Sequence, residues 1–167
     1  SAEAGADLII ELVKEGDASA IFFQMDEKDV EALMKLPYVM IGSDGGLEKV
    51  GVGHPHPRSY GTFTRVLGEY ARGRQILSLE EAIRKMTSLP AQTLRLADRG
   101  LIKTGFYADI VIFDPGEVQD VATFANPHQY SRGLVSVLIN GREVLSAGQF
   151  TGQRPGQILY GQGYKPT

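Results

Sequence analysis

Residues 39–46, VMIGSDGG, place a single carboxylate where a short apolar run meets a cluster of small residues. The run Val39-Met40-Ile41, bounded by Gly42, predicts a short buried strand. Asp44 is then expected just past the end of that strand. Two interpretations follow: Asp44 is a functional carboxylate at a strand end, or it is a turn residue, because Asp-Gly is common in turns.

The segments before this stretch alternate between helix and strand patterns. Residues 2–15 carry apolar side chains at helical spacing, and an apolar run within 20–25 predicts a buried strand. Residues 26–36 predict a second helix, and the next strand is expected at 38–42. Helix, strand, helix, strand is the order of a parallel α/β sheet, whose ligands gather at the carboxyl ends of the strands. That rule favours the functional interpretation of Asp44.

Further helices are expected downstream. Residues 62–70 place apolar side chains on one helical face, and residues 78–96 hold two more helices. Ser78 and Glu81 have the spacing of a capping box at the start of the first of these two. The Lys and Arg residues of the segments EYARGR and RKM are interpreted as solvated helix faces.

The pattern changes after about Asp98, where short β-branched runs alternate with turns. Asn140-Gly141 lies between VSVLI and REVL, which is a strong prediction of a β-hairpin. The segment 115–133 contains two prolines and mixed polarity, and is expected to be a long loop. We therefore divide the chain into an α/β part, residues 1–97, and a small all-β part, residues 98–167.

Composition excludes several classes of function. The chain has 167 residues and a net charge of -3, which gives no basic field to attract nucleic acid. No apolar run approaches the roughly 20 residues that cross a bilayer, so no membrane partner is expected. There is no cysteine, which removes disulfides and thiolate metal ligands from this chain. A cytoplasmic location is the default expectation.

Several segments together resemble one family. IGSDGG, HPRSYGTFTRVL, SLEEAIRKMTSLPAQTLRLADRGLIKTGFYADIVIFDP and VLINGREVLSAG occur in this order in the amidohydrolase superfamily. The run HPRSYGTF narrows the resemblance to the N-acyl-D-amino-acid deacylases, or D-aminoacylases. The resemblance implies a metal-dependent (β/α)8 TIM barrel with a small β-sandwich beside it.

The resemblance also implies roles for individual residues. Asp44 falls on the position of an Asp that ends the final barrel strand, serves as general base and touches the metal. The implied metal is Zn²⁺, as one or two ions, and the implied reaction is hydrolysis of the amide of an N-acyl-D-amino acid. Substrate contacts are expected from Gly45, His56, Arg58 and Tyr60, because a guanidinium binds a carboxylate in a two-point fork.

Blander interpretations of these side chains stay open. Three interpretations of His54 and His56 stay open: loop-packing histidines, substrate-loop residues or adventitious metal ligands. Each of the two precedes a Pro, which favours extended backbone. Arg58 is alternatively part of a surface ion pair. Tyr60 is alternatively a packing residue at the base of the loop.

Length sets the largest departure from the family. A (β/α)8 barrel takes roughly 250 residues, whereas only 43 residues precede Asp44. The sequence therefore predicts the last two barrel strands and their helices, followed by the small β-sandwich, with the remaining metal ligands upstream. Such a chain is expected to be inactive and metal-free alone, and to self-associate through its unpaired strand edges.

Two rival functions remain. One is a different amidohydrolase, such as a dihydroorotase- or hydantoinase-like cyclic amidase, which would share Asp44 but lack HPRSYGTF. The other is a non-catalytic fragment or assembly module that uses its β domain only for contacts.

Overall fold

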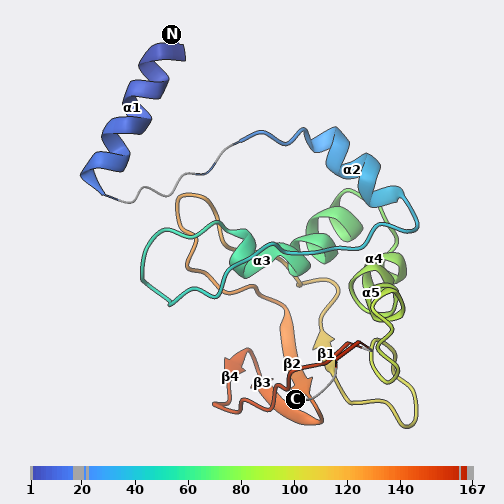
Figure 1. The fold of residues 1–167 in the computed structure, drawn as a ribbon. Helices are drawn as coiled ribbons and strands as arrows, with labels where there is room; N and C mark the ends of the chain where they lie inside the picture. The colour runs from blue at the N-terminus through green and yellow to red at the C-terminus, as the bar shows by residue number, and fades with distance from the viewer. Residues whose placement is uncertain (1, 17–20, 22, 162, 165–167) are drawn as a thin grey trace.

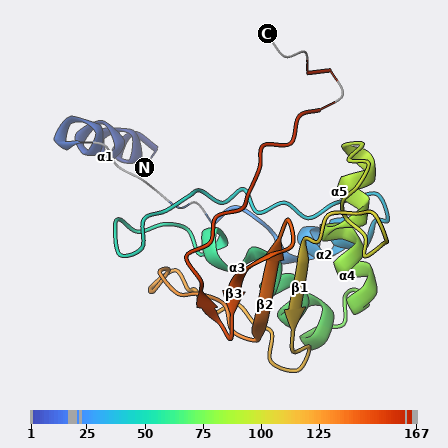
Figure 2. The ribbon, with the colours of Figure 1, turned by 90° about the horizontal axis from the view of Figure 1, so that it is seen from below.

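The computed structural model describes residues 2–16, 21, 23–161 and 163–164. Figure 1 shows a helical layer above a small sheet, and Figure 2 shows the same two layers from below. The helices are α1 (Ala2–Glu15), α2 (Glu27–Lys35), α3 (Arg58–Arg65), the π-helix η1 (Val66–Gly73), α4 (Leu79–Met86) and α5 (Ser88–Thr93). The strands are β1 (Ile110–Phe113), β2 (Leu134–Ile139), β3 (Arg142–Ser146) and β4 (Gln149–Phe150).

The sheet is antiparallel with strand order β1-β2-β3-β4. Its central hairpin confirms the prediction from sequence. Asn140 and Gly141 have φ of 49° and 76°, and Ile139 pairs with Arg142 across the turn. Two successive positive φ angles define the turn whose twist matches a hairpin, and Asn-Gly is the residue pair that adopts it most readily.

The cap residues of two helices also confirm local predictions. The Asp26 side chain accepts a hydrogen bond of 2.9 Å from the amide of Lys28 at the start of α2. Ser78 caps α4 by accepting one of 3.2 Å from the amide of Glu81. The capping box is only half formed, because the Glu81 carboxylate binds Arg84 Nε at 2.7 Å instead.

Helix α3 begins earlier than predicted and runs directly into η1, so that helical backbone extends from Arg58 to Gly73. This rod lies against the loop that follows β1. A Cβ added at Gly68 would lie 2.6 Å from the carbonyl oxygen of Val118, so the close approach requires glycine. Arg72 Nη1 donates to the same carbonyl oxygen at 2.8 Å.

The hydrophobic core lies between the helices and the start of the sheet. It contains Met34, Val66, Leu67, Tyr70, Ala71, Leu77, Ala82 and Val118, with Phe113 and Leu134 packed against it. Val118 is fully buried, although it belongs to the predicted loop 115–133. Residues on both sides of position 98 thus share one core, and the division into 1–97 and 98–167 stays a prediction.

The predicted strand at 38–42 is not formed. The segment has no sheet partner, and the amide of Ile41 donates instead to the carbonyl of Lys85 at 3.2 Å. Of the strand predicted at 20–25, residue 21 and residues 23–25 are irregular, and residues 20 and 22 lie outside the described residues. No parallel sheet occurs in the described ranges, because a strand exists only where a neighbour satisfies its backbone groups.

Helix α1 has the bounds predicted from the sequence, but its apolar face is not buried. Its side chains are exposed from Ala4 onwards, with Leu12 at 44% and Val13 at 68%. Figures 1 and 2 both show α1 standing apart from the helical layer. None of the helices described here is long and apolar enough to cross a membrane.

Candidate active site

The loop that carries Asp44 packs on the first turn of α3. Asp44 adopts a φ of 48°, and Ser43 Oγ accepts from the amide of Gly45 at 3.2 Å. Gly45 lies so close to α3 that an added Cβ would be 3.0 Å from the Cα of Ser59. Gly45 therefore brings the backbone of the loop against the helix, and its predicted substrate contact stays a prediction.

Asp44 and Arg58 form an ion pair across this contact. Arg58 Nη2 lies 2.9 Å from Asp44 Oδ2, and the two side chains are 44% and 85% exposed respectively. The amino end of α3, which begins at Arg58, also favours a carboxylate. The pair is open to solvent, so by itself it adds little stability. The close packing of Gly45 on α3 places both charged groups beside one helix end.

His56 supports the same helix end. Its Nδ1 accepts from the amide of Arg58 at 3.0 Å, and its ring meets the Phe124 ring edge-on with centroids 5.0 Å apart. Partial burial and, second, the positive charge of Arg58 hold the pKa of His56 below its usual value of 6.5. A neutral His56 is the form that can accept from the Arg58 amide.

Tyr60 is the third residue of α3. Its hydroxyl oxygen is 2.9 Å from His128 Nδ1, and its ring meets Tyr130 edge-on at a centroid distance of 5.7 Å. His128 also binds the backbone of the loop that precedes α3, at Gly51 and Gly53. His128 was missed from sequence because 68 residues separate it from Tyr60 and no local pattern links the two.

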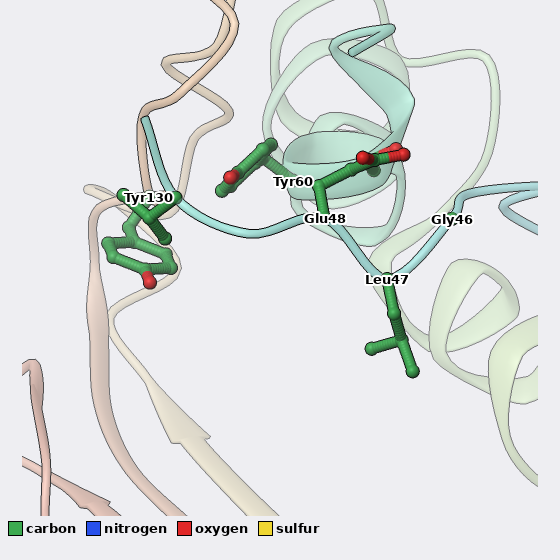
Figure 3. A pocket seen from close by; sticks show the side chains of 7 residues that line it. Gly46, Leu47, Glu48, Tyr60 and Tyr130 are labelled. Carbon is green, nitrogen blue, oxygen red and sulfur yellow. The ribbon is translucent and has the colours of Figure 1, made fainter. Parts of the chain in front are cut away.

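An open pocket of about 230 Å³ lies beside these residues. Figure 3 shows Glu48, Tyr60 and Tyr130 around it, with Gly46 and Leu47 on the loop that leaves Asp44. Its full lining is Gly46, Leu47, Glu48, Val50, Ser59, Tyr60 and Tyr130. Of the predicted site residues only Tyr60 lines the pocket directly, whereas Asp44 and Arg58 lie next to it along the chain.

Lys85 fixes the segment that leads to Asp44. Its side chain is fully buried, and Nζ donates to the carbonyl oxygens of Val39, at 3.0 Å, and of Leu36. Its own carbonyl accepts from Ile41. The interpretation of the RKM lysine as part of a solvated face is therefore wrong. The helical period placed Lys85 next to polar neighbours, and only the fold brings the 36–41 backbone to it.

The arginines of EYARGR are exposed, in agreement with the solvated face, but both also make long-range contacts. Arg72 binds the carbonyls of Pro115 and Val118, and Arg74 pairs with Glu27 and Glu31 of α2. These contacts join η1 to the loop after β1 and to α2.

The described residues do not complete a metal site. In the part that the structure describes, no three His, Asp or Glu side chains lie together as ligands. The partner of Asp44 is a cation, Arg58, and His54 Nε2 lies 2.6 Å from the carbonyl oxygen of Phe124. These residues do not fit a metal ion by themselves, because Asp44 supplies a single carboxylate group and belongs to no cluster of three ligand side chains among the described residues.

Comparison with known proteins identifies the class. A family model described as "Amidohydrolase family" matches residues 5–145. That match covers most of the chain, including the Asp44 loop, the α3 site, β1, β2 and all but the last residue of β3. The chain belongs to the amidohydrolase family.

Individual relatives narrow the similarity to one branch. The chain is 44% identical to an N-acyl-D-aspartate deacylase of Alcaligenes xylosoxydans xylosoxydans, over 95% of this chain and 31% of the relative. It is 46% identical to a D-aminoacylase of the same organism, over 85% of this chain and 29% of the relative.

A solved structure shares the fold of the chain. The N-acyl-D-glutamate deacylase from Bordetella bronchiseptica, complexed with zinc and a phosphonate inhibitor, matches with a TM-score of 0.74 and 44% identity. The match covers 82% of this chain and 28% of that chain. The chain thus spans less than a third of the length of the relatives it matches.

Proposed function

We propose that the chain is the C-terminal part of a metal-dependent N-acyl-D-amino-acid deacylase. In this proposal residues 1–97 correspond to the last two strands and helices of a (β/α)8 barrel, and residues 98–167 to the small β-sandwich beside it. The observation that carries the proposal is the Asp44–Arg58 pair, held at 2.9 Å where the loop packs on α3. The similarity to deacylases over 95% of the chain supports it.

The pair places an acid–base group beside a carboxylate-binding group. Asp44, as a carboxylate, accepts a proton from the attacking water and later returns it to the leaving amine nitrogen. Arg58 binds the α-carboxylate of an N-acyl-D-amino acid through its planar fork of N–H donors. Substrate binding thus draws the guanidinium away from Asp44 and leaves that carboxylate to act as the base.

The neighbouring pocket is assigned to the bound substrate. Tyr60 lines it, and His56 holds the first turn of α3 in place through the Arg58 amide. Gly45 keeps the Asp44 loop against the helix. In this proposal a metal would take its other ligands from residues outside those that the structure describes.

The test joins this chain to the N-terminal part of the D-aminoacylase that it resembles. The 167-residue chain alone, with added Zn²⁺, should not hydrolyse N-acetyl-D-methionine. The joined enzyme should hydrolyse it. Asp44→Asn in the joined enzyme should lower kcat by about a hundredfold or more, because the amide keeps the shape but cannot accept the proton.

A matched control distinguishes the loss of a negative charge from the loss of the catalytic base. Asp26→Asn removes the carboxylate that caps α2, and Asn caps a helix as well as Asp does. This variant should keep kcat within about twofold of the parent enzyme. A joined enzyme that folds and binds metal but turns over no N-acyl-D-amino acid would favour the non-catalytic module.

A further inference from the structure

His128 is one of the side chains that join the long loop 115–133 to the candidate site. It makes three contacts to two separate segments: Nδ1 with Tyr60 Oη at 2.9 Å, Nδ1 with the amide of Gly51 at 3.3 Å, and Nε2 with the carbonyl of Gly53 at 3.0 Å. The ring also packs edge-on against the Tyr60 ring, with centroids 5.8 Å apart. His128 is half-buried and lies outside the residues that sequence analysis selected.

The backbone contacts determine which ring nitrogen carries the proton. A carbonyl oxygen only accepts, so Nε2 facing Gly53 must be an N–H donor. An amide N–H only donates, so Nδ1 facing Gly51 must be an acceptor. Both conditions are met by one form of the ring, the neutral Nε2–H tautomer.

That tautomer decides what the Tyr60 hydroxyl can do. Since Nδ1 carries no proton, the Tyr60 O–H must donate to it across their 2.9 Å contact, and it shares the single lone pair of Nδ1 with the longer 3.3 Å contact from Gly51. The hydroxyl proton is thereby used, and the lone pairs of the oxygen remain to accept from another group. In the pocket that Tyr60 lines, its hydroxyl oxygen can thus accept from an N–H group but cannot donate to a carbonyl.

We propose that His128 is a positioning residue that holds the Gly51–Gly53 turn and fixes Tyr60 as a hydrogen-bond acceptor for the amide N–H of a bound N-acyl amino acid. The substrate part of this inference rests on the proposed function. The tautomer and the loop contacts rest on the chain alone.

The first experiment needs no activity. Long-range ¹H–¹⁵N spectra of the ¹⁵N-labelled 167-residue chain, at about pH 8 where histidine rings are neutral, distinguish the two tautomers. The spectrum is expected to show His128, assigned by its absence in His128→Ala, as the Nε2–H form. The Nδ1–H form, or an even mixture, would overturn the proposal.

The same samples report on the turn. In His128→Ala the amide of Gly51 should exchange with solvent at least about fivefold faster, because it loses its acceptor. His54→Ala is the matched control: it removes another contact between the same two loops, to the Phe124 carbonyl at 2.6 Å, but leaves Gly51 and Tyr60 bound. Equal acceleration at Gly51 in both variants would reduce His128 to a general loop anchor and overturn its role at Tyr60.

The second experiment uses the enzyme that contains this chain as its C-terminal part. His128→Asn places an acceptor oxygen near the Nδ1 position, whereas His128→Gln places an amide nitrogen near the Nε2 position and leaves Tyr60 without its acceptor. His128→Gln should raise KM for an N-acyl-D-amino acid by about fivefold with kcat within about twofold, and His128→Asn should rescue most of that loss. Equal losses in the two variants would contradict action through Tyr60.

A double-mutant cycle completes the argument. If His128 acts through the Tyr60 hydroxyl, His128→Gln should cost less than about twofold in KM in a Tyr60→Phe background. Additive losses would overturn the coupling. An enzyme without deacylase activity would refute the proposed function and with it the substrate part of this inference, while the tautomer and exchange measurements would still decide the role of His128 in the fold.

Discussion

Residues 2–57 and residues 58–150 contain similar apolar side chains, but the two regions differ in how many of them are buried. In the second region Val66, Leu67, Tyr70 and Val118 are buried together. In the first region the apolar residues of α1 are exposed, and among residues whose burial the structure describes Met34 alone is buried. An amphipathic face determines that an element can be buried, but a complementary surface decides whether it is, because burial needs two partners.

The two regions also differ in what holds them. The second region is fixed by close backbone approaches at glycines and by arginines that bind carbonyls. The first region is joined to it by Lys85, which holds the 36–41 segment, by Arg74, which holds α2, and by Met34, which enters the shared core. The Asp44 loop lies where the two regions meet. It packs on α3 of the second region but makes few other contacts.

The largest stability effect is expected deep in the second region. Gly133 has a φ of 78°, and a Cβ there would overlap the backbone of Val118. Gly133→Ala should lower the free energy of unfolding by about 3 kcal/mol through strain and overpacking. Urea denaturation followed by circular dichroism measures the change.

A matched glycine of the first region serves as control. Gly5 in α1 has nothing within 4 Å of an added Cβ, so Gly5→Ala should leave the main unfolding transition unchanged. Equal losses in the two variants would show that both regions unfold as one packed unit, contrary to the difference described above.

Lys85 tests the link between the regions. Lys85→Met should destabilise the chain by about 2 kcal/mol, because it removes a fully buried side chain's hydrogen bonds to the partly buried carbonyls of Leu36 and Val39. Lys28→Met, on the exposed side of α2, should stay within about 0.5 kcal/mol of the parent. Thermal unfolding midpoints of the two variants, compared side by side, decide the point.

Exposed apolar residues of the first region predict concentration-dependent association. Phe23 is 78% exposed, and α1 presents Ile9 and Val13 to solvent. Sedimentation velocity should show larger species as concentration rises, because contiguous apolar surface is rarely left open to water. Ile9→Glu should reduce the association, whereas Ile102→Glu, at a well-exposed site of the second region, should not. A chain that stays monomeric at all concentrations would contradict this expectation.

The smallest effect is a pH dependence at the α3 end. Because the folded-state pKa of His56 lies below its usual 6.5, the unfolded chain takes up the proton at a higher pH than the folded chain does. The contribution is therefore complete above about pH 6.5 and is lost as pH falls through the folded pKa, by less than about 1 kcal/mol because the ring is partly exposed.

NMR titration of the His56 ring gives that pKa directly. The variant His56→Asn keeps an acceptor for the Arg58 amide, so it should fold equally well but lose this part of the pH dependence. A titration midpoint at or above 6.5 in the folded chain would remove the effect.

The sequence by itself determined the local features. Neighbouring residues specify the caps at Asp26 and Ser78, the bounds of α1 and the Asn140-Gly141 hairpin. These features depend on local sequence and need no distant partner. Motif resemblance identified the amidohydrolase family, which the family match confirms. It also selected Asp44 and Arg58, which the structure brings together, while their catalytic and binding roles stay predictions.

Only the tertiary structure decided the long-range contacts. Burial of Lys85, the His128 contacts to Tyr60 and the packing of Val118 against Gly68 join residues that are tens of positions apart. The strand predicted at 38–42 failed for the same reason, since a strand is stabilised by the neighbour that receives its hydrogen bonds and not by its own sequence. Apolar pattern and turn chemistry set what each segment can become, and the partners available in the folded chain select the outcome.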